Sequence, residues 1–195
     1  MPDVKHFDED TALARAMDLF WRRGYEATSV QDLVDELGLS RSSLYATFGD
    51  KDRLYRSALQ RYCHAEAGPR HDRLEAADSA LEAVRGLLEG IAAAPAAFPD
   101  RRGCLVVNAA MERVPSDSAT AEAVAAQLAS FEATLTRVLR RGQERGELDP
   151  GQDAVAVARF LVAVVQGMRV VGKAGADPAG LGDVVEVALV AIRRA

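Results

Sequence analysis

Apolar residues recur at three- and four-residue spacing along almost the whole chain, and this helical period limits what the chain can fold into. The first example is a stripe made by Leu13, Ala16, Met17 and Phe20, which share one helix face. No segment alternates apolar and polar residues between hairpin turns, and no repeat of fixed period is present. Aromatic residues make up only 6% of the chain, which also favours helix over sheet. The sequence therefore predicts an all-α protein.

Glycine, proline and capping residues divide this pattern into separate helices. The expected helices cover residues 8–23, 30–37, 41–48, 51–67, 79–93, 103–113, 118–145, 152–172 and 181–194. Gly24 is placed to end the first helix in a left-handed conformation. Thr28 and Ser29 are both suitable caps for the second helix, and the spacing does not choose between them. Gly68-Pro69 is expected to end the fourth helix.

Residues 29–48 have the pattern of two short helices joined by a tight turn. The first of these helices has a buried face made by Val30, Leu33, Val34 and Leu37. Gly38-Leu39-Ser40 then provides a turn containing glycine, the usual connector between helices that cross steeply. In the second helix, Leu44 and Phe48 lie one turn apart and point inward. An ordinary helical hairpin shares this pattern, so the turn alone does not establish DNA binding.

The outer face of the 41–48 helix is small and polar, as insertion into a DNA major groove requires. The side chains on this face and its flanks are Ser42, Ser43, Tyr45, Ala46 and Thr47. Arg41 and Lys51 flank the helix and are placed to meet phosphates. Residues 1–63 nevertheless hold nine Lys and Arg against eleven Asp and Glu. A sequence-specific DNA-binding protein tolerates this balance when its positive charge is local.

The run from Ala12 to Tyr55, ALARAMDLFWRRGYEATSVQDLVDELGLSRSSLYATFGDKDRLY, resembles the DNA-binding domain of the TetR family of bacterial transcription regulators. The most specific parts are LFWRRGYEATSV at 19–30 and LYATFGDKDRL at 44–54. The resemblance implies a three-helix helix-turn-helix domain over residues 1–50, a connecting helix over 51–67, and a C-terminal helical bundle over 68–195 for ligand binding and dimerisation. It also implies a repressor that leaves double-stranded operator DNA when a small-molecule inducer binds.

The resemblance assigns DNA contacts to particular positions. The family's third helix reads the major groove, and its contact positions fall on Arg41, Ser42, Tyr45, Ala46, Thr47 and Lys51, with Thr28 and Ser29 at a phosphate. Many members carry an aromatic residue where this chain has Ala46, and His where it has Thr47. At position 46 the sequence therefore supports only an apolar contact with a thymine methyl group.

The 152–172 segment is apolar around most of its circumference. Its polar residues Gln152, Arg159, Gln166 and Lys173 recur at seven-residue spacing. Arg159, Gln166 and Arg169 interrupt the apolar stretch from Ala154 to Val171. A membrane span would tolerate these side chains poorly, so a buried helix of a water-soluble protein is the better interpretation. Together with the similar 181–194 helix, it could form a four-helix homodimer interface, as the resemblance also implies. The alternative is a monomer that wraps both helices, but so small a domain offers few neighbours for them.

The helices over 79–145 are expected to enclose a pocket against the 152–172 helix, where the resemblance implies a small apolar or amphipathic inducer. Candidate lining residues are Phe98, Cys104, Leu105, Asn108, Met111, Phe131 and Phe160. Apolar residues at helical spacing belong to the core by default, so core packing is the competing interpretation for each apolar candidate. Asn108 is an amide within an apolar stretch, and the competing interpretation is that it faces solvent.

Cys104 is placed where a thiolate would be favoured. It follows Arg101, Arg102 and Gly103 and lies in the first turn of a predicted helix, whereas Cys63 has no such neighbourhood. Some TetR-type repressors that sense electrophiles or oxidants carry a Gly-Cys pair in a similar place. The alternative, which we prefer at this point, is a small buried hydrophobic residue.

Other functional classes lack support in the sequence. There is no glycine-rich phosphate loop, no His-Glu-x-x-His motif and no cysteine pair with zinc spacing, so no enzyme, metal or cofactor is expected. Two cysteines are too few for a disulfide framework, and the N-terminus has no secretory pattern, which predicts a cytoplasmic protein. An activator of the same family is the first alternative. A helical adaptor without DNA binding is the second, supported only by the acidic balance of residues 1–63.

Overall fold

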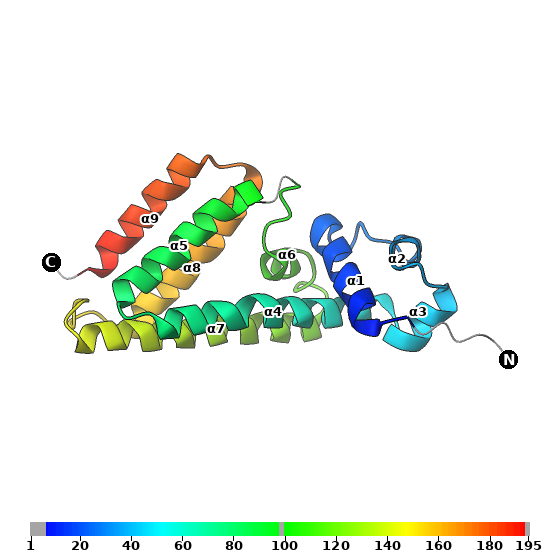
Figure 1. Ribbon diagram of the computed structural model, residues 1–195, viewed down its shortest axis with the longest axis horizontal. Helices are drawn as coiled ribbons and strands as arrows, with labels where there is room; N and C mark the ends of the chain where they lie inside the picture. The colour runs from blue at the N-terminus through cyan, green and yellow to red at the C-terminus, as the bar shows by residue number, and fades with distance from the viewer. Residues whose placement is uncertain (1–6, 98–99, 194–195) are drawn as a thin grey trace.

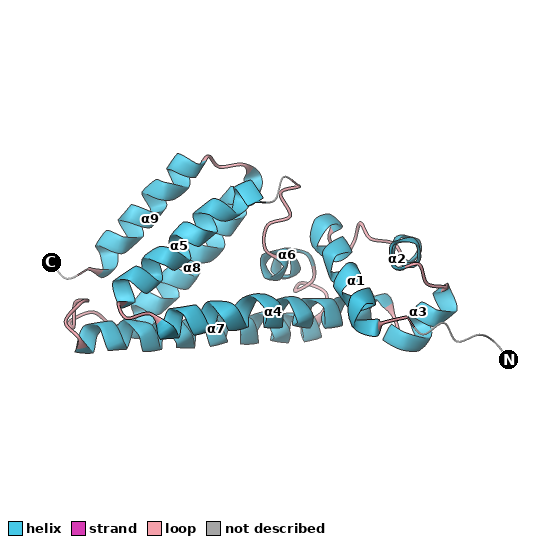
Figure 2. Cartoon of the chain, in the orientation of Figure 1, coloured by secondary structure: helices cyan, strands magenta, loops and turns pink. Residues whose placement is uncertain are grey.

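The computed structural model describes residues 7–97 and 100–193, and most of them are helical (Figure 2). The helices in these ranges are α1 (Glu9–Arg23), α2 (Val30–Leu37), α3 (Arg41–Phe48), α4 (Lys51–Ala76), α5 (Ala80–Ala97), α6 (Leu105–Glu112), α7 (Ser118–Glu144), α8 (Ala154–Ala174) and α9 (Pro178–Ile192). An isolated antiparallel bridge pairs Leu148, after α7, with Arg193, after α9. The predicted all-α class is confirmed.

The molecule is elongated, with a head of three helices at one end (Figure 1). Helices α4 and α7 run side by side along its base, and α5, α8 and α9 stack over the end away from the head. Helix α6 lies between these two groups. We call α1–α3 with the start of α4 the head, and the remaining helices the body.

Side-chain caps fix where the helices of the head begin. At α2 the structure selects Ser29 rather than Thr28, because the Ser29 hydroxyl and the Asp32 carboxylate form a capping box. Thr28 is fully buried, and its hydroxyl donates to the carbonyl oxygen of Gly24. Ser40 caps α3 by accepting the backbone N–H of Ser43. These caps are local in sequence, which explains why α2 and α3 begin where the sequence predicts.

Helix α4 is longer than predicted, because it continues through Gly68-Pro69 to Ala76. A proline inside a helix costs about 3 kcal/mol, so contacts beyond it must offset that loss. Leu74 is buried in the core of the body. The guanidinium of Arg141 on α7 donates to the carbonyl oxygens of Leu74, Glu75 and Ala77, and so holds the end of the helix. The predicted connecting segment over residues 51–67 is thus only part of a helix that also builds the body.

Two hydrophobic cores meet along α4. One core lies within the head and includes Phe20, Leu33, Leu44 and Tyr55, together with Leu105 from α6. The other lies among α4, α5, α7, α8 and α9. Because α4 contributes to both cores, it connects the head rigidly to the body.

Helix α8 is long and apolar enough to cross a membrane by length and composition, yet it packs on α5, α7 and α9. Only 28% of its most apolar window is buried within the protomer. The large apolar side chains left exposed on α8 and α9 are Phe160, Val170, Val171, Val184, Val187 and Val190. The body therefore presents an apolar surface, here called the α8–α9 face.

Candidate DNA-binding surface and ligand cavity

The helix-turn-helix predicted from residues 29–48 is present. Gly38 adopts a left-handed conformation, with φ of 67°, and its N–H donates to the carbonyl oxygen of Val34. Leu33 of α2 and Leu44 of α3 are fully buried in the head core. This packing fixes which side of α3 faces outward.

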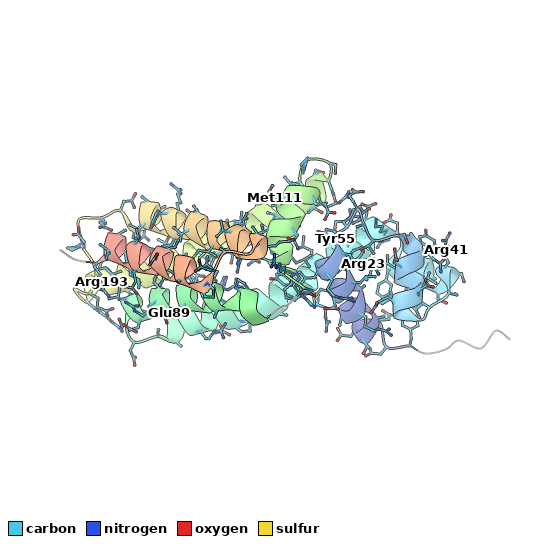
Figure 3. The ribbon with its side chains drawn as sticks, turned by 90° about the horizontal axis from the view of Figure 1, so that it is seen from above. Arg23, Arg41, Tyr55, Glu89, Met111 and Arg193 are labelled. Atoms are coloured by element: carbon cyan, nitrogen blue, oxygen red, sulfur yellow. The ribbon has the colours of Figure 1, made fainter. Side chains whose placement is uncertain are left out.

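Most of the predicted DNA-contact residues lie on the outward side of α3. Arg41, Ser42, Tyr45 and Ala46 are exposed, and Thr47 is half-buried. Arg41 lies at the end of the molecule farthest from the body (Figure 3). The structure thus brings five predicted residues of one short helix onto one accessible surface.

Thr28 departs from the prediction of a phosphate contact. It is fully buried with its hydroxyl already bonded to Gly24, so it stabilises the turn after α1 and contributes no side chain to the surface. Ser29 is exposed, but its hydroxyl belongs to the cap of α2. The Ser29 hydroxyl, the Ser29 backbone N–H and the Arg23 guanidinium together lower the pKa of Asp32 to about 2.

Lys51 is held in place by an aromatic ring. Its ammonium lies 3.9 Å from the centroid of the Tyr25 ring, and the Arg113 guanidinium lies at the same distance from that ring. The Tyr25 hydroxyl donates to Asp52 over 2.8 Å. Burial, followed by this hydrogen bond, raises the pKa of Tyr25 to about 12, and burial lowers the pKa of Lys51. Lys51 is therefore an ordered, half-buried cation at the start of α4.

Helix α6 and the loop before it connect the body to the head. The Trp21 indole N–H donates to the carbonyl oxygen of Gly103 over 2.9 Å. At the other end of α6, the Glu112 carboxylate accepts the backbone N–H groups of Tyr25 over 2.9 Å and Glu26 over 2.8 Å. These bonds join the loop before α6 to the last turns of α1, and the end of α6 to the turn that follows α1.

A cavity of about 650 Å³ lies among α4, α5, α8 and the loop before α6. Its apolar wall includes Leu74, Ala83, Leu87, Ile91, Ala94 and Pro95. Its cationic residues are Arg70, Arg73, Arg101, Arg169 and Lys173. Trp21, Tyr62, Gly103 and Cys104 line the end toward the head. A volume of this size suits a small organic ligand.

Of the predicted pocket residues that the structure describes, only Cys104 lines this cavity. Leu105 is buried in the head core instead. Met111 of α6 is 77% exposed (Figure 3), and Phe160 is 42% exposed on the α8–α9 face. Phe98 lies outside the described residues. These corrections follow from helix orientation, which a single helical stripe does not determine.

Two further candidates lie beside the cavity. Phe131 lines a second, much smaller cavity of about 20 Å³, which shares Cys104 with the larger one. The Asn108 amide donates to the carbonyl oxygen of Arg102 over 3.0 Å and accepts from Lys173 over 2.7 Å. Asn108 thus anchors Lys173, a residue of the cavity wall.

The sequence does not predict the arginine side of the cavity, because Gly68-Pro69 predicts that α4 ends at residue 67. That expectation placed Arg70, Arg73 and Leu74 in a loop. A usable signal was present on α5, where Gly86 and Gly90 lie one turn apart. Glycine costs about 1 kcal/mol relative to alanine inside a helix, so such a pair indicates a requirement for space.

Cys104 is buried, and its Sγ accepts a hydrogen bond from the Tyr62 hydroxyl over 3.6 Å. It occupies the N-cap position of α6, although it makes no side-chain cap. Cys63 lies on α4, where burial raises the pKa of its thiol to about 11. Within the described residues, no group of three or more His, Cys, Asp and Glu side chains is arranged to hold a metal ion.

An exposed helix-turn-helix on a helical body that contains a ligand-sized cavity defines a one-component DNA-binding regulator. Residues 12–58 match the family described as bacterial regulatory proteins, tetR family, and residues 80–187 match the tetracyclin repressor-like C-terminal domain. The chain belongs to the TetR family of transcription regulators, which is not a family of enzymes.

Individual relatives support this assignment along the whole chain. The transcriptional repressor ComR of Escherichia coli is 35% identical over 176 residues, which cover 89% of this chain and 83% of ComR. The uncharacterised regulator YezE of Bacillus subtilis is 36% identical over 95% of this chain and 96% of its own. The solved structure of a cysteine-substituted CifR bound to 26-bp operator DNA is 38% identical, with a TM-score of 0.85 over 97% of this chain and 99% of that chain.

Proposed function

We propose that this chain is a cytoplasmic repressor that binds operator DNA as a homodimer and leaves it when a small molecule occupies the 650 Å³ cavity. One observation carries the proposal: the loop before α6 lines the cavity and also bonds the head. Gly103 belongs to the cavity wall, and its carbonyl oxygen accepts the Trp21 indole N–H. A ligand that displaces this loop therefore acts directly on α1.

The proposed DNA surface consists of Arg41, Ser42, Tyr45, Ala46 and Thr47, with Lys51 at a phosphate. The side chains of Arg41, Ser42, Tyr45 and Ala46 are exposed, which supports their assignment to this surface. Tyr45 is 43% exposed and is not part of the head core. The backbone N–H groups at the start of α2 are a second candidate for phosphate contact near Ser29. The operator complex of CifR supports DNA binding through this type of head.

The proposed dimer is built on the α8–α9 face. Phe160, Val171, Val187 and Val190 would remain in water in a monomer, which is unfavourable for a contiguous apolar surface. Pairing the two helices with those of a second copy would form a four-helix interface. A dimer would also present two recognition helices to successive major grooves, roughly 34 Å apart.

Release requires that the ligand prefer the conformation in which the two heads no longer match the operator. A ligand with equal affinity for both conformations would change nothing, however tightly it binds. Repression is favoured over activation because the relatives ComR and BdcR of Escherichia coli are both named repressors.

The test is a fluorescence-anisotropy titration of the purified chain with DNA from upstream of its own gene. We expect saturable binding that survives competition from unrelated DNA, and loss of binding in an Arg41→Ala, Tyr45→Ala variant that retains its helical circular dichroism. Equal binding to unrelated DNA, or none, would support the adaptor without DNA binding. A transcription reporter then separates repressor from activator by the sign of the response.

A further inference from the structure

We infer that the cavity binds an amphipathic anion, meaning an organic acid with an apolar body; its role as the inducer rests on the proposed function above. The main observation behind this inference is the excess of positive charge on the cavity wall. Five Lys and Arg residues line it, and Glu82 is the one carboxylate among the described lining residues. A cationic ligand would meet net repulsion in this cavity, whereas an anionic ligand would be attracted by the excess positive charge of its wall.

Arg169 of α8 is the central residue of this inference. It is half-buried, and its guanidinium donates to the side-chain oxygen of Gln166 over 3.3 Å. Within the described ranges, no carboxylate lies within 4 Å of Arg169, Arg73 or Arg101. The partner of Lys173 among the described residues is neutral, the side-chain amide oxygen of Asn108.

Several arginines outside the cavity form salt bridges with carboxylates. Arg85 pairs with Glu186 over 2.8 Å, Arg102 with Asp18 over 2.5 Å, and Arg113 with Asp52 over 2.5 Å. Among the described residues, Arg169 therefore differs from these arginines in having no carboxylate partner. Arg169 is half-buried, and partial burial without a counter-charge costs free energy that an acidic ligand would offset.

The inner end of the cavity is the best place for the acid group. Tyr62, Arg70, Cys104 and Arg169 line both the large cavity and the small one, so side chains from α4 and α8 meet there. The planar guanidinium of Arg169 matches a carboxylate in a two-bond arrangement.

The apolar body of the ligand would lie along α5. Gly86 and Gly90 line the cavity, and a Cβ added to either would have no other atom within 4 Å. Leu74, Leu87 and Ile91 provide apolar walls beside this open strip. The strip lies on α5, whereas Arg70 and Arg169 come from α4 and α8, so the cavity wall offers both apolar and cationic sides to one ligand.

An anion in this position would act on the loop that holds the head. The Lys173 side chain packs on Gly103, because a Cβ at residue 103 would lie 2.9 Å from its Cδ. Arg101 and Cys104 belong to the same loop and to the cavity wall. Movement of these cations toward a bound acid would therefore disturb the Trp21–Gly103 bond.

The test uses three probes with the same ten-carbon chain: decanoate, decan-1-ol and decylammonium. Binding is measured by calorimetry and by the fluorescence of Trp21, the single tryptophan of the chain, which lines the cavity. We expect decanoate to bind one site per chain, and the alcohol and the amine to bind at least about tenfold more weakly. Gly86→Leu, which fills the open strip, should abolish decanoate binding.

Arg169→Gln should weaken decanoate binding about tenfold and leave decan-1-ol binding unchanged. The matched control is Arg140→Gln, which removes an exposed arginine of α7 that does not line the cavity. Circular dichroism confirms that each variant is folded.

Equal affinity for the three probes, or no effect of Arg169→Gln, would overturn the inference. Decanoate binding that survives Gly86→Leu would place the probe on the α8–α9 face and would overturn it as well. Charge-selective binding that fails to weaken operator binding has a different meaning: the anion site would stand, and the proposed release mechanism would fail.

Discussion

The indole nitrogen of Trp21 lies 2.9 Å from the carbonyl oxygen of Gly103, and this bond joins the first helix of the head to the wall of the cavity. Arg102 strengthens the same junction, because its guanidinium bonds Asp18 over 2.5 Å and lies 5.0 Å from the Trp21 ring. The Trp21 ring also packs edge-on against Tyr62, with ring centroids 5.0 Å apart. A change in the cavity can therefore reach α1 through directly bonded residues.

Trp21→Phe should separate this bond from the packing of the ring. Phenylalanine retains an aromatic ring against Tyr62 but leaves the Gly103 carbonyl oxygen without its donor, which costs about 1 kcal/mol of stability. We expect lower stability in urea unfolding and weaker release of the operator by ligand. Ser79→Ala is the control, since it removes a 2.9 Å bond to Glu147 far from the head. If both variants impair release equally, the bond has no special part in coupling.

Lys51→Ala should weaken operator binding and reduce the slope of log affinity against log salt by about one unit. The physical reason is the loss of one phosphate contact from a cation that Tyr25 already holds in place. Arg140→Ala is the control, because it removes one positive charge from an exposed position of α7 in the body. An unchanged slope in Lys51→Ala would remove this residue from the DNA contacts.

The pKa of Asp32 reports on the cap of α2. Hydrogen bonds from Ser29, followed by Arg23, lower this pKa from 3.8 to about 2. Because the folded-state pKa is lowered, the stabilisation is fully present above pH 3.8 and is lost as the pH falls toward about 2. Ser29→Ala should raise the pKa toward its ordinary value, as measured by a carboxyl NMR titration. Ser42→Ala, in which this cap is intact, should leave the Asp32 titration unchanged.

The head could be predicted from the sequence because its determinants are local. The Ser29 and Ser40 caps, the left-handed Gly38 and the buried Leu44 all act within a few residues of their positions. The buried state of Thr28 was missed because it depends on a bond to Gly24 across a turn whose conformation the sequence leaves open.

The cavity could not be predicted in the same way, because it depends on contacts between distant segments. Helix α4 passes Pro69 since Arg141, far along the chain, holds its last carbonyl oxygens. Without that continuation, Arg70 and Leu74 cannot be assigned to a wall. Met111 and Phe160 have helical spacing typical of a core, yet both are exposed in the protomer.

Cys104 should react with small neutral alkylating reagents faster than Cys63. Cys104 lines the 650 Å³ cavity, which gives a reagent access, whereas burial raises the pKa of the Cys63 thiol to about 11. Timed alkylation with mass-spectrometric readout measures both rates. Gly86→Leu should slow the labelling of Cys104 and leave Cys63 unchanged. Faster labelling of Cys63 would contradict this prediction. It would show that Cys104, which is buried and accepts a hydrogen bond from Tyr62, serves only in packing.

Val187→Arg should distinguish a dimer from a monomer more sharply than a change in the core. Val187 is 69% exposed in the protomer, so a charged side chain there costs little unless a second copy covers it. In the proposed dimer, arginine at this position would lie in the apolar α8–α9 face, where an unpaired charge is strongly unfavourable. We expect the native chain to sediment as a dimer at micromolar concentration and Val187→Arg to sediment as a folded monomer with weakened operator binding.

Met111→Arg is the matched control, because Met111 is 77% exposed on α6, outside that face. A native chain that sediments as a monomer, or a Val187→Arg variant that remains dimeric, would show that the two protomers do not pair through this face.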